Sequence, residues 1–125
     1  MKKAISTTTA PGAVGPYSQA ISAGNILFVS GQLPVDPATS SVVEGEVAAQ
    51  ATQCCKNVAA VLQADGLGFE HVVKSTVFIT DMADFPKVNE VYKQYFSAPY
   101  PARSCVAVKA LPLGCSVEIE VIAIR

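Results

Sequence analysis

Only two stretches of this chain repeat apolar residues every three or four positions, as the buried side of a helix does. They are residues 46–64, which end just before Gly66, and a stretch that starts at a capping Asp84 and runs to about Phe96. The stretch Val72–Ile79 is instead β-branched and apolar at odd and even positions alike, as in a strand buried on both sides. Two helices packed side by side cover only one face of a sheet, so the second face needs another cover.

The strands expected around these helices are short. Of the three expected before the first helix, two are placed at residues 19–22 and 26–30, joined by a tight turn at Gly24-Asn25. Residues 31–45 contain two prolines and two glycines and are predicted to form a loop. Residues 72–79, 104–108 and 117–124 supply the later strands. The predicted order is βββαβαββ, which makes residues 1–125 a single α+β domain.

The uncovered face of this sheet predicts an oligomer. In the strand expected at residues 26–30, Leu27 and Val29 lie on one side and Ile26 and Phe28 on the other, so both sides are apolar. The chain has no further element that would cover the helix-free face, and large exposed apolar patches are unusual in soluble proteins. We therefore expect a homo-oligomer of closed cyclic symmetry whose subunits meet on this face.

Composition and charge exclude several classes of function. The formal net charge is -1 and only 15% of residues are charged, which gives no electrostatic basis for binding nucleic acid or a membrane surface. No window approaches the roughly 18 apolar residues of a membrane span. The basic start, Met1 to Lys3, is followed by hydroxyl residues where a signal peptide is apolar, so a cytoplasmic location is expected.

Metal binding is also not indicated. The four cysteines form no C-x-x-C pair, and His71 is the only histidine. This pattern argues against zinc and iron–sulfur sites, and reduced thiols are expected without a secretory signal.

Arg103 is the most unusual charged residue because it enters an expected buried strand, where a guanidinium group is costly without an anionic partner. Strand alternation places Arg103 and Cys105 on the side opposite Val106. In the last strand, Glu118 and Glu120 lie opposite the valine-rich side. If both valine-rich sides pack under the helices, this cation, thiol and pair of carboxylates gather on the helix-free face, where subunits are expected to meet.

Two interpretations of Arg103 remain open at this stage. It pairs with Glu118 or Glu120 in a structural salt bridge that fixes the register of the interface. Alternatively, it is a bidentate clamp for a small carboxylate or phosphate, and Glu118 is a general acid/base whose pKa is adjusted by burial and by the cation. Residue spacing does not decide between them.

Other candidate residues carry weaker signals, each with a structural alternative. Gly31 follows Ser30 at the end of a strand and would let a ligand approach the backbone, or it is a turn glycine. Tyr17, which follows Pro16, would bring an aromatic hydroxyl to the site, or its ring serves only for packing. Asn89 lies one position from the apolar stripe of the second helix, where a solvated side chain is common. The chain lacks a Ser-His-Asp set, a phosphate-binding loop and a dinucleotide-binding motif.

Taken together, these segments resemble the RidA/YjgF family over nearly the whole chain. The matching segments, in order, are GPYSQA, FVSGQLPVDP, VAAQATQCCKNVAAVLQADG, VVKSTVFITDMADFPKVNEVY and PARSCVAVKALP followed by VEIEVIAIR. The resemblance implies a chorismate-mutase-like α+β subunit with a six-stranded mixed sheet and two helices on one face. It also implies a homotrimer with one small-molecule site in each cleft between subunits.

The activity implied by the resemblance is that of a 2-iminobutanoate/2-iminopropanoate deaminase. Such proteins hydrolyse reactive enamines and imines released by pyridoxal-phosphate enzymes, for example 2-aminoacrylate, to 2-keto acids and ammonia without a cofactor. Arg103 would then hold the substrate carboxylate and Glu118 would activate water, while Cys105 would line the pocket through its backbone more than as a nucleophile. The remaining walls would come from Tyr17, Ser30, Gly31 and Asn89.

Two other functions are considered beside this one. The same cleft would serve a non-catalytic protein that binds or senses a 2-keto acid, which needs Arg103 but not Glu118. Endoribonuclease activity or inhibition of translation has been attached to some relatives of the family. The slightly negative charge and the single histidine argue against phosphodiester chemistry.

Overall fold

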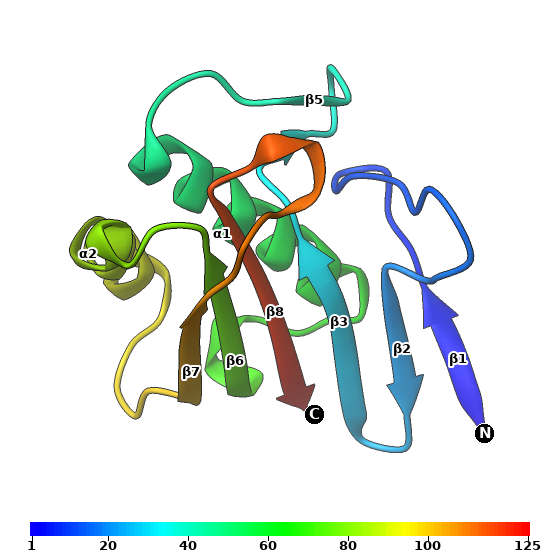
Figure 1. Cartoon of the computed structure of the whole chain (residues 1–125). Helices are drawn as coiled ribbons and strands as arrows, with labels where there is room; N and C mark the ends of the chain where they lie inside the picture. The colour runs from blue at the N-terminus through cyan, green and yellow to red at the C-terminus, as the bar shows by residue number, and fades with distance from the viewer.

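The computed structural model describes residues 1–125 and contains one main sheet with two α-helices (Figure 1). The strands of the main sheet are β1 (Lys2–Ile5), β2 (Ala20–Ala23), β3 (Ile26–Gln32), β6 (Val72–Ile79), β7 (Ala102–Ala107) and β8 (Val117–Ile124). The helices are α1 (Val47–Ala64) and α2 (Phe85–Tyr95). Neither helix is long and apolar enough to cross a membrane.

The six strands lie in the order β1-β2-β3-β8-β6-β7. All neighbours are antiparallel except β6 and β7, which are parallel and are connected through α2. Both helices lie on the same side of the sheet (Figure 1). Helix α1 lies behind the central strands, and α2 packs beside α1 near β6 and β7. The predicted α+β class, the six-stranded mixed sheet and the two helices on one face are confirmed.

The core lies between the helices and one face of the sheet. Strand β8 shows why, because its alternate residues from Val117 to Ala123 are at most 2% exposed while the residues between them are not buried. Helix α1 contributes the apolar side that its spacing predicts, with Val58 and Leu62 fully buried. Cys54 of the same helix is also fully buried, and its thiol donates a hydrogen bond of 3.6 Å to the carbonyl of Val117 in β8.

Three local expectations need correction. The first strand is Lys2–Ile5, which the sequence pattern had not located. The segment 31–45 is not all loop, since its first two residues continue β3 and two short strands, β4 (Val35–Asp36) and β5 (Ser41–Val42), pair further on. Asp84 precedes α2 but makes no capping side-chain bond; Asp81 instead accepts a hydrogen bond from the amide of Ala83 in the preceding turn.

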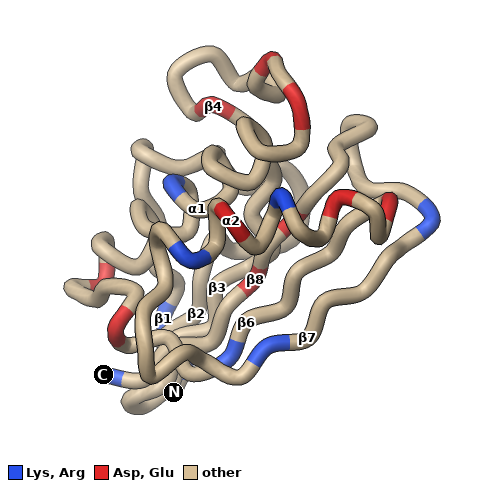
Figure 2. The backbone as a smooth tube through the Cα atoms, turned by 90° about the vertical axis from the view of Figure 1, so that its left-hand side faces the viewer, with Lys and Arg blue, Asp and Glu red and all other residues tan.

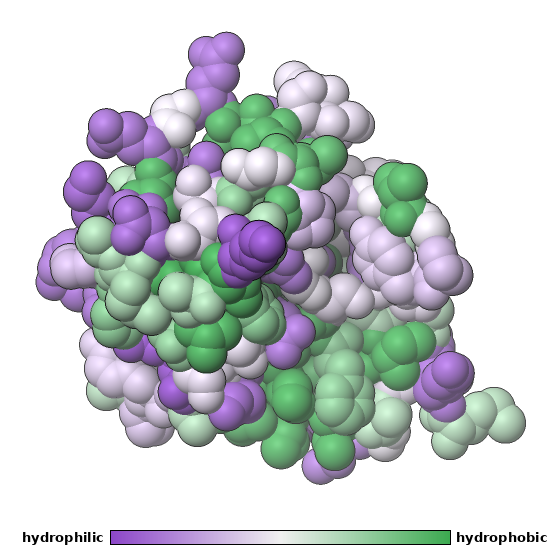
Figure 3. Space-filling view, in the orientation of Figure 1, coloured by the Kyte–Doolittle hydropathy of each residue, from purple (hydrophilic) through white to green (hydrophobic).

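The helix-free face of the sheet is apolar and uncovered within the chain. Phe28, Val106 and Ile124 are exposed to 44%, 42% and 39%, although all three lie in strands of the main sheet. Figure 3 shows the resulting hydrophobic area on the front of the strands. The structure thus has the open apolar face on which the prediction of an oligomer rests, while the oligomer itself stays a prediction.

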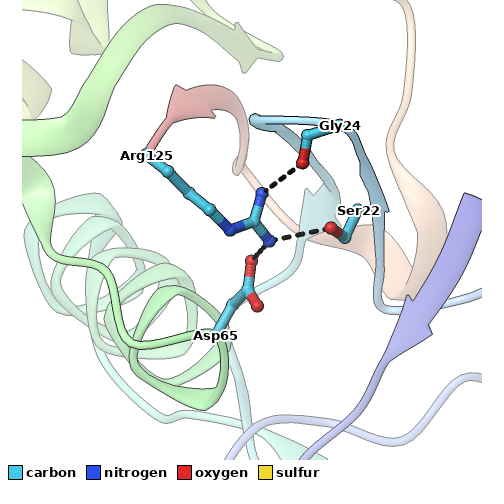
Figure 4. Close-up of polar contacts among 4 residues, drawn as sticks. All are labelled: Ser22, Gly24, Asp65 and Arg125. Carbon is cyan, nitrogen blue, oxygen red and sulfur yellow. Dashed lines mark hydrogen bonds and ion pairs between the residues drawn. The ribbon is translucent and has the colours of Figure 1, made fainter.

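Arg125, which follows β8, contacts both the β2–β3 turn and the carboxyl end of α1 (Figure 4). Its guanidinium donates to the carbonyl of Gly24 at 3.1 Å and to the hydroxyl of Ser22 at 2.8 Å, and it pairs with the carboxylate of Asp65. Asp65 caps the carboxyl end of α1, where a negative charge is unfavourable unless a cation meets it. Arg125 therefore links α1 to the β2–β3 turn.

We expect Arg125→Ala to lower the free energy of unfolding by about 1–2 kcal/mol, since several charge-assisted hydrogen bonds are lost together. The matched control is Lys93→Ala, which removes an exposed pair with Glu90 on α2 and should cost no more than about 0.5 kcal/mol. Urea unfolding of both variants measures the difference. Equal losses would contradict a structural role for the Arg125 contacts.

Candidate active site

Arg103 lies on the helix side of the sheet, not on the helix-free face. In the parallel β6–β7 pair Arg103 is the neighbour of Ser75, and Cys105 is the neighbour of Val77. Ser75 and Val77 are fully buried under the helices, and cross-strand neighbours share a face. The predicted face of Arg103 and Cys105 is therefore wrong. Strand β7 is an edge strand with five of its six residues exposed, so its apolar side does not mark the core.

The guanidinium of Arg103 rests against α2. Its Nη1 donates a hydrogen bond of 2.8 Å to Oδ1 of Asn89. Its Cζ lies 4.7 Å from the ring centroid of Tyr92 and 5.3 Å from that of Phe85, which are cation–π distances. An open cavity of about 450 Å³ adjoins this group, lined by Asn89, Tyr92, Lys93, Tyr100, Pro101 and Arg103.

No carboxylate of the chain pairs with Arg103. The ion pairs are His71 with Glu70, Lys93 with Glu90, and Arg125 with Asp65. A salt bridge from Arg103 to Glu118 or Glu120 within one chain is therefore wrong, and one between subunits stays a prediction. The positive charge of Arg103 is free to meet an anion from outside the chain.

Glu118 faces the opposite side of the sheet. It is the neighbour of Phe78 in the β6–β8 pair, and alternation from the buried Val77 directs Phe78 away from the helices. Burial raises the pKa of the Glu118 carboxyl, and the nearby charge of Glu120 raises it further. The prediction that Glu118 and Glu120 lie on the helix-free side is confirmed for β8.

Gly31 lies directly against the carboxylate of Glu118. The pairing of β3 with β8 shifts register between Val29 and Gln32, so Ser30 and Gly31 form a β-bulge beside the two glutamates. A Cβ at position 31 would overlap Oε2 and the carboxyl carbon of Glu118. Gly31 is therefore not a turn glycine, and the absence of a side chain there makes room for Glu118.

We expect Gly31→Ala to displace the Glu118 carboxylate and to lower any activity that depends on it by at least about tenfold, since a misplaced catalytic group loses its alignment. The control is Gly12→Ala, because a Cβ at position 12 meets no atom within 4 Å. Steady-state kinetics of the two variants, with thermal unfolding to verify folding, gives the comparison. Unchanged activity of Gly31→Ala would contradict the close approach.

Ser30 ties the segment that carries Tyr17 to this part of β3. Its hydroxyl donates to the carbonyl of Ser18 at 2.6 Å, and its amide donates to the carbonyl of Gln19 at 2.9 Å. Tyr17 itself is 53% exposed, so it is not a core residue. Its hydroxyl-bearing ring is available at the surface, beside a second open cavity of about 680 Å³ formed with the N-terminal segment.

Cys105 is half-buried on the side of Arg103. Burial raises the pKa of its thiol, and the charge of Arg103 offsets only part of this effect. A thiol with a raised pKa is a poor nucleophile at neutral pH. This favours the expectation that Cys105 lines the site. No group of three or more His, Cys, Asp or Glu side chains is placed to hold a metal ion.

The candidate residues thus fall into two groups within one chain. The arginine half consists of Arg103, Asn89 and Cys105 on the helix side of the β7 edge, and the glutamate half of Glu118, Gly31 and Ser30 around β8 and β3. Strand β6 lies between β7, which carries the arginine half, and β8, which carries the glutamates. Figure 2 shows blue on β7 and red on β8. The two halves of one chain therefore face opposite sides of the sheet.

Comparison with known proteins places the chain in a family. The model of the endoribonuclease L-PSP family matches residues 7–125. The chain belongs to this family, also called RidA/YjgF. The resemblance inferred from the sequence motifs is therefore confirmed.

Relatives within the RidA/YjgF family carry different names. A RutC family protein of Sinorhizobium fredii is 55% identical, over 98% of this chain and 97% of its own length. The human 2-iminobutanoate/2-iminopropanoate deaminase is 47% identical, over 100% of this chain and 91% of its own. Among solved structures, Escherichia coli TdcF with bound serine is 48% identical with a TM-score of 0.94, over 98% of each chain. Proteins named as imine deaminases are thus among its relatives.

Two residues that contact Arg103 were not predicted as part of the site. Phe85 and Tyr92 belong to the apolar repeat that predicts the second helix, and that repeat alone indicates packing. With Asn89 they follow the spacing i, i+4, i+7, which places all three on one side of α2. The spacing shows in the sequence that the three residues share one side of a helix. It does not show that Arg103 of β7 lies against that side, which only the structure reveals.

Proposed function

We propose that this protein hydrolyses small reactive enamines and imines that carry a carboxylate, as a 2-iminobutanoate/2-iminopropanoate deaminase. The observation that carries the proposal is the pair of complementary groups described above: an arginine without an acidic partner and a glutamate with a raised pKa. The names of its relatives support the same chemistry.

We infer that each site forms between two subunits of a homotrimer. The arginine half of one subunit would meet the glutamate half of its neighbour, because the two halves of one chain face opposite sides of the sheet. The open apolar face around Phe28, Val106 and Ile124 would supply the buried contact that holds the subunits together. A heterologous contact of this kind closes into a ring when the rotation between subunits allows it.

The proposed mechanism begins with binding of the substrate carboxylate. The planar guanidinium of Arg103 matches a carboxylate with two parallel hydrogen bonds and sets the orientation of the adjacent C=N group. An enamine such as 2-aminoacrylate first tautomerises to its imine. Cys105 and Tyr17 would complete the walls around this group.

Glu118 would then act on water. Its carboxylate accepts a proton from the water as the oxygen bonds to the imine carbon, which moves the C=N π electrons to nitrogen. The proton passes from Glu118 to the nitrogen, which gives a carbinolamine. Glu118 then accepts the proton of the carbinolamine hydroxyl and delivers it to the amine nitrogen, so that the C–N bond breaks, ammonia leaves and the C=O bond of the 2-keto acid forms. A raised pKa suits both steps, because the same carboxyl must accept a proton and return it.

A non-catalytic protein that binds a 2-keto acid is the second candidate. The unpaired Arg103 favours it as much as it favours the enzyme, and only Glu118 distinguishes the two. Ribonuclease activity has less support, since the net charge is -1 and the cluster around Arg103 includes no histidine.

The test is a rate measurement with an imine generated in place. A pyridoxal-phosphate dehydratase acting on serine releases 2-aminoacrylate, and formation of pyruvate is followed with and without this protein. We expect formation of the keto acid to accelerate in proportion to the concentration of the protein. No acceleration, together with binding of 2-oxobutanoate, would favour the binding protein instead.

A further inference from the structure

We propose that Tyr92 is the positioning residue of the carboxylate clamp, holding Arg103 in its binding geometry before any ligand arrives. The proposal rests on the proposed function, because it assumes that Arg103 binds the carboxylate of the substrate. It assigns a role to an aromatic residue that the sequence pattern places in the core. Three features of the structure carry it.

The first feature is a column of aromatic rings that ends at Arg103. Tyr92 stacks on Phe96 with ring centroids 4.0 Å apart and planes inclined by 13°, and the edge of Phe69 meets Phe96 at 4.7 Å and 73°. Tyr92 and Phe96 are 5% and 2% exposed, so both rings are packed on nearly all sides. The guanidinium of Arg103, 4.7 Å from the Tyr92 centroid, therefore lies against a fixed surface.

The second feature is an anchor for the Tyr92 hydroxyl. It forms a hydrogen bond of 2.7 Å with the hydroxyl of Ser75, which is fully buried. Ser75 is the direct neighbour of Arg103 in the β6–β7 pair. Ser75, which holds the Tyr92 ring, and Arg103, which rests on that ring, thus lie side by side on adjacent strands. The position of the ring relative to Arg103 is therefore fixed by the pairing of β6 with β7.

The third feature is that the guanidinium is held without being neutralised. Its contacts within the chain are two aromatic rings and the amide oxygen of Asn89, and none of these carries a charge. An acidic partner would fix the arginine as well but would compete with the ligand. Because the rings and the single Asn89 acceptor are neutral, Arg103 keeps its full positive charge. Its remaining N–H groups stay available to a carboxylate.

The test compares three variants on α2. Tyr92→Leu removes the ring, Tyr92→Phe keeps the ring and loses the bond to Ser75, and Val88→Ala opens a core cavity on the same helix at a fully buried residue. Calorimetry with 2-oxobutanoate gives the dissociation constant of each variant. Kinetics with generated 2-aminoacrylate separates KM from kcat, and sedimentation and thermal unfolding verify assembly and folding.

We expect Tyr92→Leu to raise the dissociation constant and KM by about tenfold with kcat changed less than about twofold, since it disorders the clamp without touching the water-activating group. Tyr92→Phe should bind about two- to threefold more weakly than the wild type, because the ring remains but its bond to Ser75 is lost. Val88→Ala should bind like the wild type at temperatures where it is folded, although its unfolding temperature falls.

A second readout follows Arg103 in the free protein. Its Nε–H signal in the NMR spectrum should be resolved and slow to exchange in the wild type, faster to exchange in Tyr92→Phe, which lacks the bond to Ser75, and averaged in Tyr92→Leu. This measurement needs no ligand and no activity. An unchanged Nε–H signal in a folded Tyr92→Leu would overturn the positioning role.

The remaining outcomes separate this proposal from the proposed function. Wild-type binding of 2-oxobutanoate that Tyr92→Leu weakens, without imine hydrolysis, would overturn the enzyme and support the positioning role. Equal affinity in folded Tyr92→Leu and wild type, or an equal loss in Val88→Ala, would overturn the positioning role and leave the enzyme standing. A wild type that neither binds a 2-keto acid nor accelerates imine hydrolysis would overturn both.

Discussion

Replacing Arg103 with Ala is expected to weaken binding of a 2-keto acid by about 10²- to 10³-fold and to lower kcat/KM at least as much. No other cation is bonded to Asn89 or stacked on Tyr92, and Lys93, which lines the same cavity, has no planar fork of donors. Arg103→Lys should recover only part of the loss, because an ammonium group cannot form the two parallel hydrogen bonds. Calorimetry with 2-oxobutanoate measures the affinity.

The control for this experiment is Lys87→Ala, which removes the same charge from an exposed position of α2. Its affinity should match that of the wild type, which excludes a general effect of the net charge. Arg103→Ala is not expected to unfold the protein, since the guanidinium lies at the surface of an edge strand. Retained binding in folded Arg103→Ala would contradict the clamp.

Replacing Glu118 with Gln is expected to lower kcat by about 10²- to 10³-fold, the usual contribution of a general acid–base group. Binding of 2-oxobutanoate should change by less than about threefold, because Gln keeps the shape of the side chain beside Gly31. This split between rate and affinity distinguishes the enzyme from the binding protein. Full activity of Glu118→Gln would refute the proposed mechanism.

The pH dependence gives an independent test of the same group. Glu118 must be ionised to accept a proton from water, so the rate should fall as pH falls through its raised pKa. Glu120→Gln removes the smaller cause of that rise, and the acid limb should move to lower pH. It should stay above the ordinary range of a glutamate, because burial remains. An acid limb that Glu120→Gln leaves in place would contradict the assignment to Glu118.

The fold was largely predictable from the sequence because its signals are local. The apolar alternation of β8 predicted its buried side, and the three- and four-residue spacing predicted α1. The same reasoning failed on β7, where Val106 lies on the exposed, helix-free side. Strand β7 pairs only with β6 and packs little against the helices, so burial does not select its residues. Its face is set by pairing register, which one strand's sequence does not contain.

The candidate site was predictable in its residues but not in its arrangement. Arg103 and Glu118 were identified from charge placed in strands, yet they were expected on one face and lie on two. The bulge at Ser30 and Gly31 depends on how β3 pairs with β8, and the support from Tyr92 depends on contact between α2 and β7. Both are contacts between segments far apart in the chain, which periodicity within a segment does not report.

The shared site is tested most directly by mixing two inactive variants. Arg103→Ala and Glu118→Gln are unfolded together in equal amounts and refolded, so that the proposed trimers contain both chains. A site made from one chain's arginine half and its neighbour's glutamate half would be intact in about a quarter of the random combinations. We predict that imine hydrolysis returns to about a quarter of the wild-type rate, well above either variant alone. Activity that stays at the level of the separate variants would contradict a site shared between subunits.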